Sequence, residues 1–268
     1  MGRRVSFYVV GLISVYLCSS VANSSCAAEA KQITLRWLGQ SFFVLTTSAG
    51  TRVAFDPHAI DAFGRPTTAA DLVLISHPHP DHVRVDSITN RDKAKIIEGV
   101  KVQPPVAEGA PPRLNWNPVD ETFRDVKVRN LGVYHDTTQG MQRGKNSIFI
   151  LEVDGLKIVH LGDLGHLLTD DQVRQIGPVD VLMIPVGGVY TINGSKAKEV
   201  VAQLKPKMYI LPMHYGTRTF EDLLPPDEFL EGQKNVQRML TTNELTIRTD
   251  FHPPAPVIVL LGWEKGRK

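Results

Sequence analysis

The stretch His77-Pro78-His79-Pro80-Asp81-His82 directly follows the run Asp71-Leu72-Val73-Leu74-Ile75-Ser76. The apolar part of this run is typical of a strand that is buried on both faces. Three imidazoles and one carboxylate then follow within six residues. Each can donate a lone pair to a divalent cation such as Zn²⁺, Mn²⁺ or Fe²⁺. The two prolines restrict the backbone of the loop, so less conformational entropy remains to be lost on metal binding. The stretch therefore predicts a metal site at the end of a buried strand.

Other candidate ligands follow predicted strands later in the chain. His135 comes after 131–134, Asp163 after 158–162 and His214 after 210–213. Loops at strand ends are where a rigid scaffold usually places functional side chains. Each of the three therefore stands where a functional side chain could lie.

The spacing His-x-His-x-Asp-His after an apolar strand, with the later ligands in this order, resembles the metallo-β-lactamase superfamily. Two segments near the start, 37–41 (Trp-Leu-Gly-Gln-Ser) and 55–58 (Phe-Asp-Pro-His), also look like the opening strands of that family. The resemblance extends from about residue 33 to about residue 262. It implies an α/β fold, a four-layer αββα sandwich with the metal site at one edge of two facing sheets.

The resemblance also implies two divalent metal ions, with Zn²⁺ favoured and Mn²⁺ or Fe²⁺ as alternatives. The first ion is assigned to three histidines and the second to Asp81 and two histidines, with one carboxylate bridging both ions. In this chain the assignments are His77, His79 and His135; Asp81, His82 and His214; and Asp163 as the bridge.

The chain departs from the family pattern at Gln40, where many relatives carry a histidine. This leaves open any substrate contact from that corner, and we expect it to have no bearing on the metal ligands.

A metal pair of this kind implies a hydrolase. A water shared by two cations loses much of its proton affinity, and the resulting hydroxide can attack an ester, lactone or phosphodiester. The fold does not choose among these bonds. The alternative is a metal-binding or ligand-sensing protein of the same fold without significant turnover, and a true β-lactamase is a less favoured reading.

The first thirty residues differ from the rest. A basic start at Arg3-Arg4 precedes an apolar run over 5–17, and small residues surround Ala28. This pattern predicts a secretory signal peptide over 1–30, a hydrolase domain over 31–268, and export to the periplasm or beyond. An uncleaved membrane anchor is the alternative, but the run is shorter than the ~20 residues that a spanning helix needs. We therefore expect no stable membrane insertion after cleavage.

The remaining chain is nearly neutral and lacks thiols. Both cysteines, Cys18 and Cys26, lie inside the predicted signal segment, so cysteine is excluded as a ligand of the mature chain. The net charge of +2 falls to +1 without the first thirty residues, which carry two arginines and one glutamate. A chain without a basic excess does not favour nucleic acid as a partner, and we expect a small-molecule substrate.

Short apolar runs separated by turn residues predict strands at 33–38, 42–46, 52–55, 71–75, 126–134, 147–153, 156–161, 179–185 and 207–211. Asp154-Gly155 predicts a hairpin turn. Helices are predicted at 170–176, with Thr169 as N-cap, and at 195–204. Segment 103–118 contains five prolines and predicts an extended loop, either a passive connector or a flap with Trp116 as its contact residue.

Two residues are candidates for proton transfer. Asp81 would ligate a metal beside the nucleophile, and His166 follows Asp163 closely on a glycine-containing turn. A neutral imidazole there could donate or accept a proton near neutral pH. Asp136 could either orient a ligand or form a turn with Thr137 and Thr138.

The remaining histidines and two tyrosines are less clear from the sequence. His160 alternates with inward apolar residues and is expected to be a core residue. Tyr190 and Tyr215 are candidate donors to a developing oxyanion, with core or surface roles as alternatives. His58 has no clear role, and His252 is expected to have none in catalysis.

Overall fold

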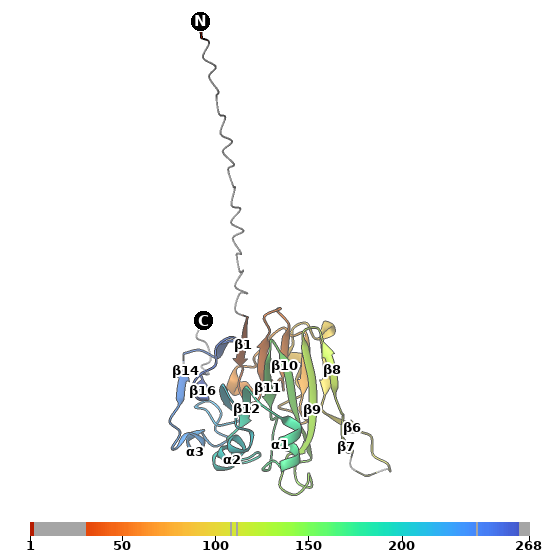
Figure 1. Ribbon diagram of the computed structural model, residues 1–268. Helices are drawn as coiled ribbons and strands as arrows, with labels where there is room; N and C mark the ends of the chain where they lie inside the picture. The colour runs from red at the N-terminus through yellow and green to blue at the C-terminus, as the bar shows by residue number, and fades with distance from the viewer. Residues whose placement is uncertain (3–30, 108, 111, 240, 263–268) are drawn as a thin grey trace.

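The computed structural model describes residues 1–2, 31–107, 109–110, 112–239 and 241–262. Two β-sheets pack face to face in this part of the chain (Figure 1). The predicted signal peptide lies outside the described residues, apart from its first two. Within the described residues, no helix has the length and apolar character needed to cross a membrane.

The first sheet has six strands, and the histidine loop follows β4, which lies next to the edge strand β5. Its order is β15 (Glu244–Arg248), β1 (Gln32–Trp37), β2 (Phe43–Thr46), β3 (Arg52–Phe55), β4 (Leu72–Ile75) and β5 (Lys95–Glu98). Buried and less buried residues alternate along β1, so Ile33, Leu35 and Trp37 face the second sheet. β4 is buried along its whole length, as the sequence predicts.

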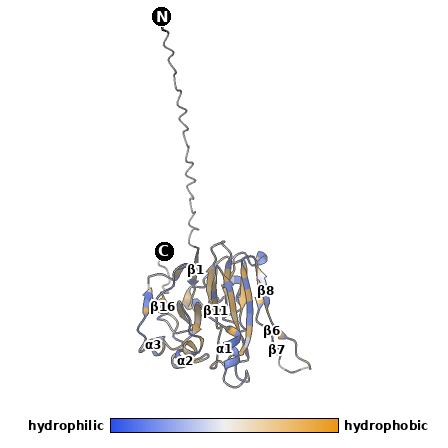
Figure 2. Cartoon of the chain, viewed as in Figure 1, coloured by the Kyte–Doolittle hydropathy of each residue, from blue (hydrophilic) through white to orange (hydrophobic). Residues whose placement is uncertain are grey.

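The second sheet has eight strands. Its order is β14 (Val236–Met239), β16 (Val257–Leu261), β13 (Tyr209–Met213), β12 (Val181–Pro185), β11 (Leu156–His160), β10 (Lys145–Val153), β9 (Val126–Tyr134) and β8 (Asp120–Phe123). Strands β11, β12 and β13 are parallel to one another. Hydrophobic residues are concentrated on the strands of the sandwich, whereas α1 (Asp170–Ile176) is largely hydrophilic (Figure 2).

The helices cover only one of the two sheets extensively. Buried residues of α1 and α2 (Gly194–Leu204), such as Ile176 and Val200, join the core shared by the two sheets, and α3 (Asp227–Leu230) contacts α2. The outer face of the six-stranded sheet is instead covered by loop residues, among them Val83 and Ile88. Three short 3₁₀ helices lie in these loops, at Asp61–Phe63, Val85–Ser87 and Arg91–Lys93. The predicted sandwich is confirmed, but its fourth layer consists of loops and 3₁₀ turns in place of long helices.

Local predictions in the second half are confirmed. Asp154 and Gly155 have φ values of 51° and 80° and join β10 to β11, as a tight hairpin turn requires. Thr169 accepts a hydrogen bond from the Gln172 backbone N–H at 3.2 Å and so caps α1. Helix α2 begins one residue earlier than predicted, after Asn193 as its N-cap.

The prediction of an extended loop over 103–118 is wrong in its second half. Residues Arg113–Trp116 form β7, which pairs with β6 (Val100–Gln103) in a hairpin that extends away from the sandwich (Figure 1). Pro104, Pro105 and Pro112 lie between the two strands, so the paired strands remain free to hydrogen-bond. Trp116 anchors this hairpin, because its indole N–H lies 3.1 Å from the carbonyl oxygens of both Val133 and Asn146.

Candidate metal centre

The predicted ligands converge because their strands end at the same edge of the sandwich. Strands β11 and β13 are parallel, and β9 points the same way because β9 and β11 are both antiparallel to β10. His135, Asp163 and His214 follow the ends of β9, β11 and β13, respectively. The loop 77–82, which follows β4, meets them from the other sheet.

A single carboxylate oxygen lies at the centre of the cluster. The Oδ2 atom of Asp163 is close to the Nε2 atoms of four histidines that belong to both predicted ligand sets. The distances are 3.0 Å to His214, 3.2 Å to His82, 3.3 Å to His135 and 3.8 Å to His77. This arrangement suits a carboxylate shared by two neighbouring cations.

The other predicted ligands form three overlapping groups with this carboxylate. In each group the potential ligand atoms all lie within 4.8 Å of one another. The groups are His77, His79 and His135; Asp81, His82 and His214; and His77, His82 and Asp163. The structure thus brings together all seven predicted ligands.

The donor set fits divalent cations. His135 and His214 are buried, and the Nδ1 atom of each has no hydrogen-bond partner among the described residues. The Nε2 atom of His77 lies only 3.1 Å from the Nδ1 atom of His79. Buried imidazoles that lack partners and face a buried carboxylate are unfavourable unless a cation compensates them. Imidazole nitrogens and carboxylate oxygens are also the ligands that Zn²⁺ accepts.

Electrostatics keep the central carboxylate ionised. Burial alone would raise the pKa of Asp163, but the imidazoles of His214 and His82 hold it well below its usual range. Burial and the nearby His82 lower the pKa of His77, which favours the neutral imidazole that a metal requires. Ionised carboxylate and neutral imidazole are the protonation states that bind metal.

Two residues outside the ligand set hold the histidines in place. The Asp56 carboxylate accepts hydrogen bonds from the Ser76 backbone N–H and hydroxyl, both at 2.7 Å, and its Oδ2 lies 3.1 Å from His82 Nδ1. The Ser76 hydroxyl lies 2.9 Å from Nδ1 of His77. Asp56 therefore supports one histidine from each ligand set. The sequence alone does not predict either role, although Asp56 directly follows a strand and Ser76 directly precedes His77.

Two glycines allow the site loops to approach each other. A Cβ atom at Gly165 would lie 2.2 Å from the His135 carbonyl carbon, and one at Gly187 would lie 2.2 Å from the His214 carbonyl oxygen. Such contacts are too short for any side chain. The loops after β11 and β12 therefore pack directly on the backbone of two ligands.

The expectation that Gln40 has no bearing on the ligands is wrong. Its side-chain amide donates a hydrogen bond to Oδ2 of Asp81 at 3.0 Å. The side chain of Asp81 is 36% exposed, far more than those of His82 and Asp163. Gln40 thus orients a candidate ligand that is partly exposed to the pocket.

His166 lies close to the cluster in sequence but makes backbone contacts. Its Nε2 accepts a hydrogen bond from the Tyr134 N–H at 3.2 Å, and its Nδ1 lies 2.7 Å from the Leu167 carbonyl oxygen. It does not line the pocket beside the ligands. Its role in proton transfer stays a prediction, and the hydrogen bonds give it a structural role as well.

Asp136 forms a turn in this structure. Its buried carboxylate accepts five hydrogen bonds from the loop that follows it, four from backbone N–H groups and one from the Thr138 hydroxyl. None of these five hydrogen bonds comes from the side chain of a candidate metal ligand. Of the two roles that the sequence left open, the structure supports turn formation.

The remaining candidates divide between core and surface. His160 stacks on Phe55, and its Nε2 lies 3.0 Å from the Ser41 carbonyl oxygen, so it is a satisfied core residue as expected. Tyr215 is also buried, and stacks on Trp37. Tyr190 lines the pocket. His252 is exposed and lies in the irregular segment 251–256 near the end of the chain.

His58 is buried in an aromatic environment. Its ring lies against those of Phe42 and Phe63, and burial lowers its pKa to about 4. Its Nδ1 accepts a hydrogen bond from the Ile60 N–H at 3.1 Å. His58 is therefore a neutral histidine that packs the wall of the site.

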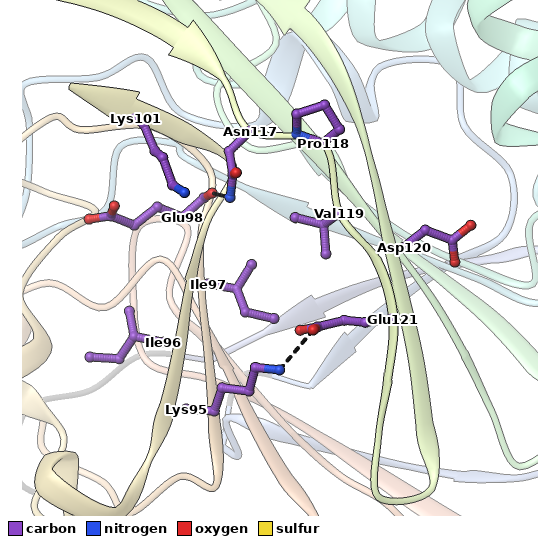
Figure 3. A pocket seen from close by; sticks show the side chains of 10 residues that line it. All are labelled: Lys95, Ile96, Ile97, Glu98, Lys101, Asn117, Pro118, Val119, Asp120 and Glu121. Carbon is purple, nitrogen blue, oxygen red and sulfur yellow. Dashed lines mark hydrogen bonds and ion pairs between the residues drawn. The ribbon is translucent and has the colours of Figure 1, made fainter. Parts of the chain in front are cut away.

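The pocket over the ligands has a volume of about 350 Å³. It is lined by His79, Pro80, Asp81, His135, Arg143, Asp163, Tyr190 and His214. A separate hollow of about 550 Å³ lies between β5 and segment 117–121 (Figure 3). Its Lys95 and Glu121 pair with each other at 2.8 Å, and no histidine lines it. The chemistry of the predicted site belongs to the smaller pocket.

Comparisons with known proteins agree with this geometry. Residues 34–214 match the family model described as a Beta-lactamase superfamily domain. A UPF0173 metal-dependent hydrolase from Thermococcus onnurineus is 30% identical over 199 residues, which cover 69% of this chain and 85% of the relative. A relative from Thermococcus kodakarensis with the same description is 28% identical over 201 residues, with the same coverage.

Solved structures give the same result. A protein from Thermotoga maritima, described as a candidate Zn-dependent hydrolase of the metallo-β-lactamase superfamily, has a TM-score of 0.63 and 32% identity. The match covers 86% of this chain and 98% of that one. The metallo hydrolase Igni18 from Ignicoccus hospitalis has a TM-score of 0.58 and 22% identity. The match covers 82% of this chain and 100% of the Igni18 chain, and it shows the same fold.

A two-sheet sandwich with a histidine and carboxylate cluster at one edge defines a metal-dependent hydrolase. The chain belongs to the metallo-β-lactamase superfamily, among the relatives described as UPF0173 metal-dependent hydrolases.

Proposed function

We propose that this protein is an exported binuclear hydrolase that cleaves an ester, lactone or phosphodiester bond in a small molecule. The observation that carries the binuclear proposal is the position of Asp163 Oδ2, which lies within 3.8 Å of histidines from both ligand sets. A carboxylate in this position can offset part of the charge of two cations and lie between them. Zn²⁺ is the favoured metal, with Mn²⁺ or Fe²⁺ as alternatives.

The residues of the chain divide the work. His77, His79 and His135 would hold one cation, and Asp81, His82 and His214 the other, with Asp163 between them. Bound cations would supply a hydroxide nucleophile at neutral pH and a Lewis acid for the substrate. Asp81 would orient the nucleophile by accepting a hydrogen bond from it. The Asp81 carboxylate lines the pocket, and Gln40 holds its Oδ2 atom by a hydrogen bond.

The pocket size supports a small substrate. About 350 Å³ is at the lower end of the range of small-molecule sites. The nearly neutral chain gives no support for a nucleic acid as substrate. Export is proposed from the basic and apolar start of the sequence.

A metal titration combined with a substrate panel tests this function. The metal-free protein should take up two equivalents of Zn²⁺. The loaded protein is tested on a panel of nitrophenyl esters, lactones, bis(4-nitrophenyl) phosphate and a chromogenic cephalosporin, and it should hydrolyse members of the first three classes. Asp163→Ala should lose both properties. Two bound metals without turnover on any member would favour the alternative, a metal-binding or ligand-sensing protein. Hydrolysis confined to β-lactams would assign the less favoured reading.

A further inference from the structure

The pocket over the ligands has a rim that carries a positive charge. Besides the predicted ligands and Pro80, its lining contains Arg143 and Tyr190. Arg143 lies in the loop that follows His135, and Tyr190 lies in the loop that follows β12. Neither residue belongs to the ligand set, so both are free to contact a substrate.

Arg143 is held rigidly. Its backbone N–H donates to the Asp136 carboxylate at 2.7 Å, and its Nη2 donates to the Val189 carbonyl oxygen at 3.0 Å. The guanidinium carbon lies 5.6 Å from the centre of the Tyr190 ring, within the range of a cation–π interaction. With its backbone held by Asp136 and its guanidinium held at two points, this side chain loses less entropy when it binds a ligand than a free arginine would.

The loop that carries Tyr190 is anchored to a metal ligand. The Gly187 N–H donates to the His214 carbonyl oxygen at 3.0 Å. Val189 has a φ of 58°, which is unusual for a β-branched residue, and it lies in a turn closed by hydrogen bonds from the Tyr190 and Thr191 N–H groups to the Gly188 carbonyl oxygen. This backbone turns the Val189 carbonyl toward Arg143. The two rim residues therefore keep a fixed position relative to the cluster.

The charge of Arg143 has no acidic partner within 4.0 Å among the described residues. Seven other arginines in this part of the chain do have such partners: Arg52, Arg65, Arg84, Arg91, Arg124, Arg174 and Arg248. A guanidinium has five N–H donors, and the bond to Val189 uses only one. The remaining donors can serve an anionic ligand in the pocket.

We infer that Arg143, supported by Tyr190, binds a negatively charged group of the substrate, a carboxylate or a phosphate located away from the bond that is cleaved. This inference rests on the proposed function and names its substrate class: small anionic esters or related compounds. A guanidinium matches both groups because it can donate two parallel hydrogen bonds to them. Neutral substrates would lack this contact.

The kinetic test uses esters that share one leaving group. Mono(4-nitrophenyl) glutarate carries a distal carboxylate, 4-nitrophenyl 4-phosphonobutanoate a distal phosphonate, and 4-nitrophenyl butyrate neither. The Zn²⁺-loaded protein should prefer one or both anionic esters over butyrate by at least tenfold in kcat/KM. The preferred anion identifies the natural group. Arg143→Gln should reduce that ratio at least tenfold, mainly through KM, and Arg143→Lys should retain part of it. Arg174→Gln, which removes an exposed arginine on α1, should keep the wild-type ratio.

A binding test separates this inference from the proposed hydrolysis. The corresponding 4-nitroanilides of glutarate, 4-phosphonobutanoate and butyrate can be measured by calorimetry on the same proteins. At least one anionic amide should bind at least tenfold tighter than the neutral amide, and Arg143→Gln should remove this difference. If no ester is cleaved but this result holds, the proposed hydrolysis fails for esters and the anion site stands. If wild-type protein binds the anionic amides no tighter than the neutral one, or Arg143→Gln keeps the wild-type difference, the inference is wrong.

Discussion

The Oδ2 atom of Asp56 lies 3.1 Å from Nδ1 of His82, on the side of the ring that faces away from Asp163. The same oxygen accepts the Ser76 hydroxyl bond at 2.7 Å, and that hydroxyl lies 2.9 Å from Nδ1 of His77. One fully buried carboxylate thus fixes the orientation of histidines from both ligand sets.

Asp56→Asn should therefore weaken metal binding without removing a ligand. Outer partners of ligating histidines typically contribute 10- to 100-fold in affinity. We expect a loss of about this size, measured by competition with a chromophoric chelator. Asp86→Asn is the matched control, because Asp86 is exposed and pairs only with Arg84. Equal affinities for both variants would show that Asp56 does not orient the ligands.

Asp163→Ala should lower the metal content from two equivalents to one or fewer. The carboxylate lies between the two groups, so its removal leaves cations in each group without their shared counter-charge. Elemental analysis after dialysis in metal-replete buffer measures the occupancy, and circular dichroism checks the fold. Wild-type protein with no bound transition metal, or a variant that keeps two equivalents, would contradict the binuclear proposal.

The convergence of the candidate ligands could be predicted from the sequence because each of them follows a strand at short range. His77 to His82 form one local cluster, and His135, Asp163 and His214 each end a run of apolar residues. Parallel strands bring such ends to one edge, so the family pattern sufficed to assemble them.

The contacts that support the site could not be predicted in this way, because they join residues that lie far apart in the sequence. Trp116 packs over Gly132 and closes a hairpin, whereas the prolines of 103–118 suggested only a loop. Arg143 reaches the pocket because Asp136 folds the loop back; the sequence offered a turn at Asp136 to Thr138 but gave no sign that its carboxylate also binds the backbone as far as Arg143. Gln40 contacts Asp81 across 41 residues of sequence.

His166→Ala tests whether this histidine has a catalytic role besides its hydrogen bonds to the backbone of the loop. Loss of two backbone contacts should destabilise the fold by about 1–2 kcal/mol, measured by urea unfolding. Proton transfer would add a loss of kcat of at least about tenfold on the preferred substrate, with metal content unchanged. His252→Ala, at an exposed position, serves as control. If both variants turn over at the wild-type rate, His166 is structural and the proton comes from another source.

Export can be tested by mass. The basic start, apolar run and small residues predict cleavage between about Ala28 and Lys31. The intact mass of the extracytoplasmic protein should therefore correspond to a chain beginning near residue 31. A protein that keeps Met1 in the cytoplasm would refute export, and one that keeps it in the membrane fraction would support an uncleaved anchor.

Asp136→Asn should loosen the loop that carries Arg143. The carboxylate accepts five hydrogen bonds, including those from the Gly140 and Arg143 backbones, and an amide can replace only some of them. Because several of these are bonds to a charged acceptor, we expect a loss of about 2–3 kcal/mol in the free energy of unfolding. Asp92→Asn, at an exposed carboxylate, should lose almost nothing.

The same contacts give the loss a pH dependence. Burial alone would raise the pKa of Asp136, but the backbone N–H groups of Arg143 and Gly140 lower it well below its usual value. A carboxyl group whose pKa is lower in the folded state stabilises the fold above its unfolded pKa of ~3.9, and this contribution disappears as the pH falls toward the folded value. The difference in stability between wild type and Asp136→Asn should therefore be constant from about pH 5 to 7 and should shrink below about pH 4. A difference that does not change with pH would show that the carboxylate charge is not what holds the loop.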